Sequence, residues 1–427
     1  MTEPTPQAGK DLKSLLDTPR SPAGSYMLKA AAARQTRFHY VLSAFLPSVL
    51  WEWMGHYLGH RLGPRHRFNE YQGSTADIGI YTLGDDSVIG GSPDARGEIR
   101  VCLAGDWGTG TDESNEVAQK MMEFNPHYTI HLGDVYYVGD NAEVKENCLG
   151  MHNPRHSFIP CTWPMGSVGS FALNGNHEMY ALGNAYFDLF LPALGMRPSP
   201  RKAPLGQKAS FFCLQNESWR IIGLDTGYNS IGIPIFEYLF KPNCDLPNQL
   251  LRWLREIVKP SEGKRATILL SHHQYFSAFQ GWYTKQAKQL EALIASPVLW
   301  FWGHEHRMAI YGRHKFKGGL EAYGRCIGHG GMPVEINAPV KYTECPSIVY
   351  DNRRYPSSEG IDVGFNGFVR LTFSKNRLLI DYRDLNNNQL LTESWEVNNG
   401  VLTGKDINLI SQDAGLRHVQ DLRQAIC

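Results

Sequence analysis

The sequence predicts an α/β fold from Ile99 onward. Short apolar segments alternate there with segments whose apolar residues recur at helical spacing, and alternating strands close the chain. The expected early strands are Ile99–Ala104, Tyr128–Leu132, Phe171–Asn174, Arg220–Leu224, Thr267–Ser271 and Val298–Trp302. The expected helices are Asn115–Phe124 and Pro247–Val258. Apolar and polar residues alternate in two segments on either side of a Lys375-Asn376 turn, Gly367–Phe373 and Leu378–Arg383. This alternation predicts a β-rich end of the chain.

The composition is that of a folded protein with a sizeable core. The chain has 427 residues, of which 42% are hydrophobic, and division by ~150 residues per domain gives two or three units. Lys plus Arg is 42 and Asp plus Glu is 42, so the formal net charge is 0. This balance excludes an overall basic bias toward nucleic acid or anionic membrane. We therefore expect no nucleic-acid partner.

The eight cysteines predict reduced thiols. No two have CxxC spacing, which argues against a zinc ribbon or a redox dithiol, and the cysteines are too sparse for a disulfide scaffold. Cys148 and Cys161 flank one irregular loop and are the pair that could form a bridge. Residues 1–18 lack the charged and apolar regions of a secretory signal, so the expected location is cytoplasmic.

The N-terminal residues differ in character from the rest of the chain. Residues 1–24 are rich in Pro, Ser, Thr and Gly and predict a flexible tail, whereas residues 25–97 predict a helical extension and a linker. Within the extension, the aromatic-rich residues 38–58 fall short of the ~20 clean apolar residues of a membrane span, and no transmembrane segment is expected. A helical hairpin packed on the main domain is the favoured interpretation. Peripheral membrane contact through residues 38–58 is the alternative, because Trp and Tyr suit the headgroup region.

Five apolar segments end in residues that can bind metal. They read RVCLAGDWG, YTIHLGDVYY, FALNGNHE, TILLSHHQ and VLWFWGHEH, and they supply Asp106, Asp134 with Tyr137, Asn176 with His177, His272 with His273, and His304 with His306. In open α/β sheets, functional groups gather at the carboxyl ends of the strands. A single Gly-Asp turn or HxH pair is more often incidental, but five such segments in order predict a ligand set for two metal ions.

The five segments resemble the calcineurin-like metallophosphoesterases. GDWG, GDVYY, GNHE, LLSH and GHEH are similar, in order, to that family's five signatures, and more narrowly to its purple acid phosphatase branch. Most of the superfamily has a histidine where this chain has Gly108, while the purple branch uses a tyrosine that corresponds to Tyr137. The resemblance spans about residues 97–384. It implies a four-layer αββα sandwich over residues 98–390, with residues 391–427 packed on that catalytic domain.

The resemblance also implies a ligand set. One metal would take Asp106, Tyr137 and His306, the other would take Asn176, His272 and His304, and Asp134 would bridge them. Phenolate and carboxylate are hard anionic donors, so the Tyr137 site should favour Fe(III). The site with neutral His and Asn donors suits a divalent Fe, Zn or Mn ion. Tyr136 is the competing phenol, but the spacing of the motif selects Tyr137, and Tyr136 is expected to be packed.

Three further histidines receive roles. The resemblance implies that His177 binds no metal and protonates the leaving oxygen as a general acid. His273 is a candidate substrate contact or a group behind the ligands, and these two roles stay open. His329, in the glycine-rich segment CIGHGGMP, is a further candidate substrate contact.

The chain departs from the family's pattern in two places. The fourth motif often continues as His-x-Pro in the family, whereas here it continues His272-His273-Gln274. The residues before Gly97 match neither the export signal nor the β-sandwich module of many relatives. The shape of the loop after His272 and the role of the extension are therefore left open by the resemblance.

The function implied is hydrolysis of a small phosphate ester, most simply a phosphomonoester, with a metal-activated hydroxide attacking phosphorus. A phosphodiesterase on the same site is the alternative, because the motifs specify phosphoryl chemistry and not the ester. A more remote alternative is a membrane-docked binding protein whose site has lost its activity. GDWGTGT lacks the Lys-Ser/Thr of a phosphate-binding loop, which excludes a P-loop NTPase. No GxSxG motif occurs, which excludes a serine hydrolase of that type.

Overall fold

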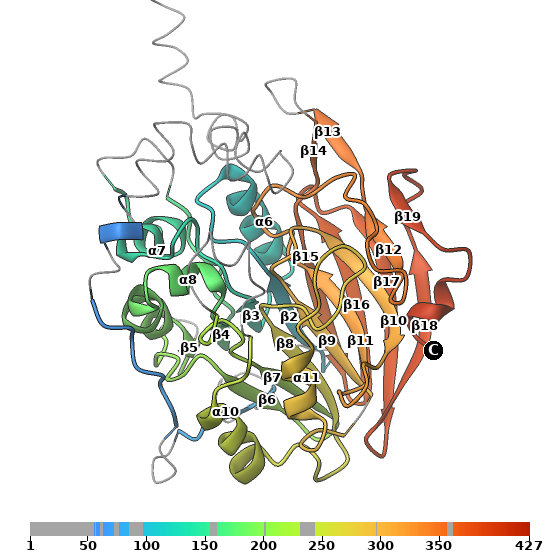
Figure 1. Ribbon diagram of the computed structural model, residues 1–427, viewed down its shortest axis with the longest axis horizontal. Helices are drawn as coiled ribbons and strands as arrows, with labels where there is room; N and C mark the ends of the chain where they lie inside the picture. Colours follow the sequence, from blue (N-terminus) through green and yellow to red (C-terminus); the bar gives the residue numbers. More distant parts are fainter. Residues whose placement is uncertain are drawn as a thin grey trace, which may run out of the picture.

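The computed structural model places two mixed β-sheets face to face, with helices outside them (Figure 1). It describes residues 55, 57–59, 63–71, 77–84, 97–153, 160–199, 202–230, 244–295, 297–356 and 362–427. The predicted tail and most of the predicted extension, including residues 38–54, lie outside these ranges. Residues 55 and 57–59 are helical. Within the described ranges, no helix has both the length and the apolar character needed to span a bilayer.

The first sheet has eight strands. In spatial order they are β18 (Val401–Leu409), β17 (Gln389–Asn398), β16 (Arg377–Asp384), β15 (Gly367–Ser374), β2 (Ile99–Ala104), β3 (Tyr128–His131), β4 (Gly169–Ala172) and β5 (Gly195–Met196). The pairs β2–β3 and β3–β4 are parallel, whereas β15 to β18 form an antiparallel meander. The C-terminal strands therefore continue the sheet that carries the first three predicted motifs.

The second sheet has nine strands. In spatial order they are β1 (Ile80–Thr82), β6 (Phe212–Gln215), β7 (Trp219–Gly223), β8 (Ala266–Ser271), β9 (Val298–Trp302), β11 (Ala322–Ile327), β10 (Met308–His314), β12 (Ser347–Asp351) and β19 (Leu416–His418). The pairs β7–β8 and β8–β9 are parallel. A short hairpin of β13 (Arg354–Pro356) and β14 (Asp362–Gly364) lies apart from both sheets.

The predicted strands and helices match the structure with small shifts. β2 and β9 have the predicted bounds, and the other early strands differ by one or two residues at their ends. Residues 248–258 are helical throughout, as α10 (Asn248–Trp253) followed by the π-helical turn η3 (Leu254–Val258). α6 (Asp112–Glu123) begins three residues before the predicted helix, because Thr111 caps it by accepting from the Ser114 N–H.

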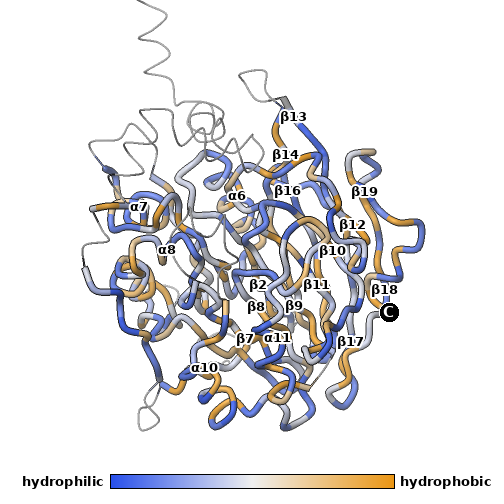
Figure 2. Tube along the Cα trace, in the orientation of Figure 1, coloured by the Kyte–Doolittle hydropathy of each residue, from blue (hydrophilic) through white to orange (hydrophobic). Residues whose placement is uncertain are grey.

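Three apolar layers hold the fold together. The central one lies between the sheets and joins residues such as Val101 and Leu371 to Ile221 and Leu299. A second layer packs α10 and α11 (Thr284–Leu290) on the nine-stranded sheet, and a third packs α6 and η1 (Tyr186–Phe190) on the eight-stranded sheet. Hydrophobic segments accordingly follow the strands of the molecule's interior (Figure 2). This layering fits the predicted sandwich.

A segment of the predicted extension is bound to the domain. His66 stacks on Phe187 with ring centroids 4.6 Å apart, and the Arg65 guanidinium lies 3.7 Å from the centre of the Tyr228 ring. The Tyr71 hydroxyl donates to the Phe211 carbonyl at 2.8 Å. Strand β1 follows and pairs with β6. The described residues 63–71 and 77–84 therefore form part of the folded unit.

The described cysteines are free thiols. Cys148 and Cys161, the pair for which a bridge was considered, are both buried and unbridged. Burial raises the pKa of both the Cys148 and the Cys213 thiol, the latter to about 12, so these sulfurs stay protonated near neutral pH.

A buried ion pair links the two sheets. Arg325 on β11 donates from Nε and Nη2 to the two carboxylate oxygens of Glu393 on β17, at 2.9 and 2.7 Å. Both side chains are fully buried. Arg325 also donates to the Ala425 carbonyl at 2.8 Å, which ties the C-terminal segment to the pair.

Glu393→Gln is expected to lower the free energy of unfolding by roughly 3–5 kcal/mol, because it leaves the guanidinium uncompensated in the interior. Urea unfolding measures this loss. Arg377→Gln, which breaks the exposed Arg377–Glu396 pair at 3.0 Å, should leave the midpoint close to the parent value, since such pairs contribute little. Equal losses in both variants would contradict the structural role of the buried pair.

Candidate metal centre

The five predicted motifs meet at one edge of the sandwich. Asp106, Asp134 and Asn176 follow β2, β3 and β4 of the eight-stranded sheet, and Asn176 begins α8 (Asn176–Tyr180). His272 follows β8, and His304 follows β9 of the nine-stranded sheet. These strands are parallel neighbours in each sheet. Their carboxyl ends therefore bring donors from both sheets to a single place.

Three of these residues have a left-handed backbone. Asp106, Asp134 and His304 have φ values of 57°, 73° and 66°. A residue with a Cβ adopts this conformation at some energetic cost, and such residues gather where function requires them. This left-handed conformation makes the chain turn sharply at the end of each strand, so that the three residues lie close together.

Two glycines allow the loops to approach each other. A Cβ at Gly175 would lie 2.1 Å from Asp134 Oδ1, and a Cβ at Gly303 would lie 2.5 Å from Asp106 Oδ2. No side chain fits at those distances. The glycines of GNHE and GHEH thus make room for the two carboxylates.

The first donor group consists of Asp106, Tyr136 and His306, with Asp134 beside it. The Tyr136 hydroxyl lies 2.8 Å from Asp106 Oδ1, 3.1 Å from Asp134 Oδ2 and 3.0 Å from His306 Nε2. His306 Nε2 lies 3.6 Å from Asp106 Oδ1. Two carboxylates, a phenol and an imidazole thus converge, with the carboxylates and the phenol buried and His306 partly exposed.

The phenol whose contacts with this group the structure shows is that of Tyr136. Tyr137 reaches the site through its backbone: its carbonyl accepts from His177 Nδ1 at 2.5 Å, and its N–H donates to the Glu143 carboxylate. Tyr136 was expected to be a packing residue, and it is buried with 1% of its surface exposed, but its hydroxyl faces the predicted ligands. The assignment of Tyr137 as a ligand stays a prediction.

The second donor group consists of Asn176, His272 and His304. Asn176 Oδ1 lies 3.1 Å from His272 Nε2 and 3.1 Å from His304 Nδ1. His272 Nδ1 lies 2.9 Å from the Leu132 carbonyl, which fixes the tautomer with its proton on Nδ1 and leaves Nε2 free as a ligand. The group therefore offers one amide oxygen and two imidazole nitrogens.

Asp134 connects the two groups. Its Oδ2 lies 3.1 Å from the Tyr136 hydroxyl on one side and 3.2 Å from His272 Nε2 on the other. Its Oδ1 accepts from the His177 backbone N–H at 3.1 Å. A carboxylate in this position can touch an ion in each group.

Burial and mutual attraction shift the pKa values of the donors in the site. Burial raises the pKa of the Asp106 carboxyl to about 8. Although burial also disfavours charge on Asp134 and His272, their mutual attraction holds the pKa of Asp134 well below its usual range and raises that of His272. A bound metal ion would add positive charge beside these carboxylates and would favour the neutral form of His272.

The donor types and their spacing fit metal ions. Ligand atoms of Asp106, Asp134 and His272 lie within 4.8 Å of one another, and so do those of His272, His273 and His304. The two sets share His272. Burial lowers the pKa of His304, which favours the neutral imidazole that binds metals.

His177 lies beside the donor groups. Its Nε2 is 3.8 Å from Asp134 Oδ2, while its Nδ1 is occupied by the Tyr137 carbonyl. Burial lowers the pKa of His177 below its ordinary value. The ring therefore presents Nε2 to the same space without belonging to either set of converging donors.

Two carboxylates, Glu143 and the Glu178 of the GNHE motif, hold the loops of the site. Glu143 accepts backbone N–H bonds from Val138 and Gly139, both at 2.8 Å, and so fixes the loop whose carbonyl receives His177. Glu178 Oε2 accepts from the N–H groups of Asp134 and Gly175 at 3.2 and 3.0 Å. The Asp140-x-x-Glu143 capping box is the sequence signal for the first.

The two candidate substrate contacts differ in position. His273 is fully buried, and its ring centroid lies 4.6 Å from that of His304. His329 is also buried, on a loop whose Gly330 N–H donates to the Gly105 carbonyl at 2.9 Å, and its Nε2 lies 2.9 Å from where a Cβ on Gly367 would be. The structure thus places His273 beside His272 and His304, which are candidate metal ligands, and His329 at the start of β15.

A cavity of about 520 Å³ lies elsewhere on the molecule. Its lining includes Glu70 with Arg252, Arg255 and Glu256 of the α10–η3 helix. It contains none of the residues of the metal centre, so we attach no catalytic role to it.

Comparison with known proteins supports the family. Residues 99–308 match the model of the calcineurin-like phosphoesterases. Among solved structures, GAP50 of Plasmodium, the anchor in the inner membrane complex, is 14% identical, with 70% of this chain and 89% of that chain covered and a TM-score of 0.44. A purple acid phosphatase from yellow lupin seeds is 15% identical, with 68% and 52% covered and a TM-score of 0.40.

A third solved structure is PhoD, which is 12% identical, with 77% of this chain and 74% of that chain covered and a TM-score of 0.42. No curated protein sequence matches the chain. The match over residues 99–308 covers all five motifs and the strands that position them. Residues 99–308, with the five motifs, are therefore similar to the calcineurin-like phosphoesterases, whose family model they match.

Proposed function

We propose that this protein is a dinuclear metal-dependent hydrolase of phosphate monoesters, similar in chemistry to the acid phosphatases. The observation that carries the proposal is the position of Asp134 Oδ2, which lies between two complete donor groups at 3.1 and 3.2 Å. Such an arrangement holds two ions close enough to clamp one phosphate. A small phosphate ester is the substrate class that fits.

The proposed reaction assigns a role to each group of residues in the site. Two bound ions would supply an activated water and charge stabilisation for the phosphate. The ions would be held by Asp106, Asp134 and the ligand histidines His272, His304 and His306. In its imidazolium form His177 would donate the Nε2 proton to the leaving oxygen as a general acid, while its Nδ1–H is held by the Tyr137 carbonyl. Glu143 and Glu178 fix the loops that carry these groups.

Turnover of p-nitrophenyl phosphate and of bis(p-nitrophenyl) phosphate by metal-loaded protein tests the reaction. The proposal predicts a higher kcat/KM for the monoester. A preference for the diester would assign the site to a phosphodiesterase. Hydrolysis of neither ester by protein that carries two metals would reject the proposed function.

We further propose Fe(III) in the group of Asp106 and His306, with a divalent Fe, Zn or Mn ion in the group of Asn176 and His304. Hard anionic donors favour the trivalent ion. Burial, together with the charges of Asp106 and Asp134, raises the pKa of Tyr136, so its phenol keeps its proton without a metal. A trivalent ion at this position would displace that proton and give a coloured phenolate complex.

Tyr136→Phe and Tyr137→Phe decide which tyrosine supplies the phenolate. The geometry of the hydroxyl predicts that Tyr136→Phe loses the visible charge-transfer band and holds Fe(III) less well, while Tyr137→Phe keeps both. The visible spectrum and iron content of each variant measure this. The reverse result would assign the ligand to Tyr137, as the motif spacing implies. A colourless iron-loaded parent protein would exclude both.

A further inference from the structure

His273 has a ring nitrogen that the described structure leaves unused. The side chain is fully buried, and Nε2 has no hydrogen-bond partner among the described residues. Leaving a buried polar atom unpaired costs free energy, so such an atom calls for a ligand. The residue directly follows His272, at the end of β8.

The other side of the ring is fixed by Thr226. Its Oγ1 accepts from the His273 backbone N–H at 3.0 Å and lies 3.1 Å from His273 Nδ1. A hydroxyl oxygen can accept two hydrogen bonds, so the tautomer with the proton on Nδ1 satisfies both contacts. That tautomer leaves a lone pair on Nε2. Metal-binding histidines are commonly oriented in this way, through a hydrogen bond from the opposite nitrogen.

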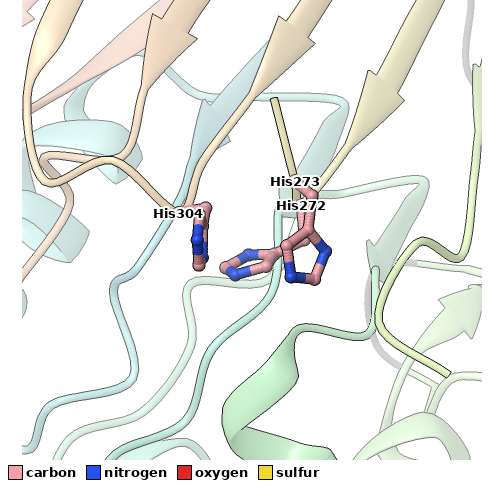
Figure 3. Close-up of side chains that lie close together, drawn as sticks. All are labelled: His272, His273 and His304. Carbon is pink, nitrogen blue, oxygen red and sulfur yellow. The ribbon is translucent and has the colours of Figure 1, made fainter. Parts of the chain in front are cut away.

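Three imidazoles therefore gather at the second donor group. The ring of His273 lies 4.6 Å from that of His304 and 4.9 Å from that of His272, centroid to centroid. Figure 3 shows the three side chains grouped in one place, two from the end of β8 and one from the end of β9. One ligand nitrogen from each lies within 4.8 Å of the others. A small closure of the rings would bring them to a single ion.

We propose that His273 is a further ligand of the ion held by Asn176, His272 and His304, so that this half of the centre has three imidazoles. The inference rests on the proposed dinuclear function and goes beyond it, because it adds a ligand to the set that the motifs imply. Imidazole donors suit Zn²⁺ better than they suit the hard ion Mn²⁺, which prefers oxygen. The third imidazole should therefore make this half of the centre selective for zinc.

The test uses full-length protein loaded with iron and then titrated with zinc or manganese. His273→Gln is expected to weaken Zn²⁺ binding at the second site by at least roughly 10–100-fold, the range seen when even an outer partner of a metal ligand is lost. Mn²⁺ binding should change less. X-ray absorption at the zinc edge should show three imidazoles in the parent and two in the variant. Thr226→Val, which keeps the ring and removes its Nδ1 partner, should weaken Zn²⁺ binding by less than His273→Gln.

An unchanged zinc affinity and zinc-edge spectrum in folded His273→Gln would overturn the proposal, as would a raised KM for the ester with zinc binding intact, which would assign His273 to the substrate. Should His273→Gln fail to fold, two imidazoles on zinc in the parent spectrum would overturn it and three would support it. A parent protein that takes up no metal would reject the proposed function as well.

Discussion

Asp134→Ala is expected to remove both metal ions and nearly all hydrolysis. Asp134 Oδ2 lies 3.1 Å from the phenol of one donor group and 3.2 Å from an imidazole of the other. Its Oδ1 also accepts from the His177 backbone. Loss of this carboxylate therefore removes a ligand from each ion and loosens the loop of the general acid. Metal content per chain and turnover of p-nitrophenyl phosphate measure the effect.

Asp384→Asn is the matched control for this change. Asp384 is also a fully buried carboxylate, but it is paired with Arg353 at 3.0 Å and belongs to neither donor group. Its substitution should lower the unfolding midpoint and leave two metals bound. Retention of two metals with normal turnover in Asp134→Ala would show that Asp134 is not the shared ligand.

The parts of the fold that the sequence predicts well are those with a strong local pattern. β2 and β9 are apolar on both faces and end in Gly-Asp and Gly-His, so both of their boundaries can be read from the sequence. The prediction that several strands deliver donors to one edge follows from parallel topology alone. The structure brings Asp106, Asn176, His272 and His304 together in this way.

Pairing between distant strands and the orientation of single side chains are not local properties. Residues 391–427 were expected to be a segment packed on the domain, and their strand pairing was not predicted: β17 pairs with β16 and β18 pairs with β17, so both extend the eight-stranded sheet. Motif spacing alone favours Tyr137 as the phenol, yet the Tyr136 hydroxyl contacts Asp106. The loop that presents it is held by Glu143, whose role depends on contacts that spacing does not record.

His177→Ala is expected to slow turnover by roughly 10²–10⁴-fold, the usual range for a positioned general acid, while both metals stay bound. The ring lies outside the two groups of converging donors, and its Nε2 is 3.8 Å from Asp134 Oδ2. Its removal deletes a proton donor without deleting a ligand. Metal content, the visible spectrum and kcat separate this outcome from that of Asp134→Ala.

The leaving group makes the His177 prediction specific. An alkoxide needs a proton as it departs, whereas p-nitrophenolate is stable without one. The loss in kcat should therefore be larger for an alkyl phosphate than for p-nitrophenyl phosphate. Tyr180→Phe is the control for an indirect effect, since the Tyr180 ring lies 4.7 Å from His177 and its hydroxyl accepts from Asn176 Nδ2 at 2.8 Å, so any slowing that it causes should be equal for the two esters. Equal slowing of both esters, or loss of metal in His177→Ala, would show that His177 positions the centre and does not protonate the leaving oxygen.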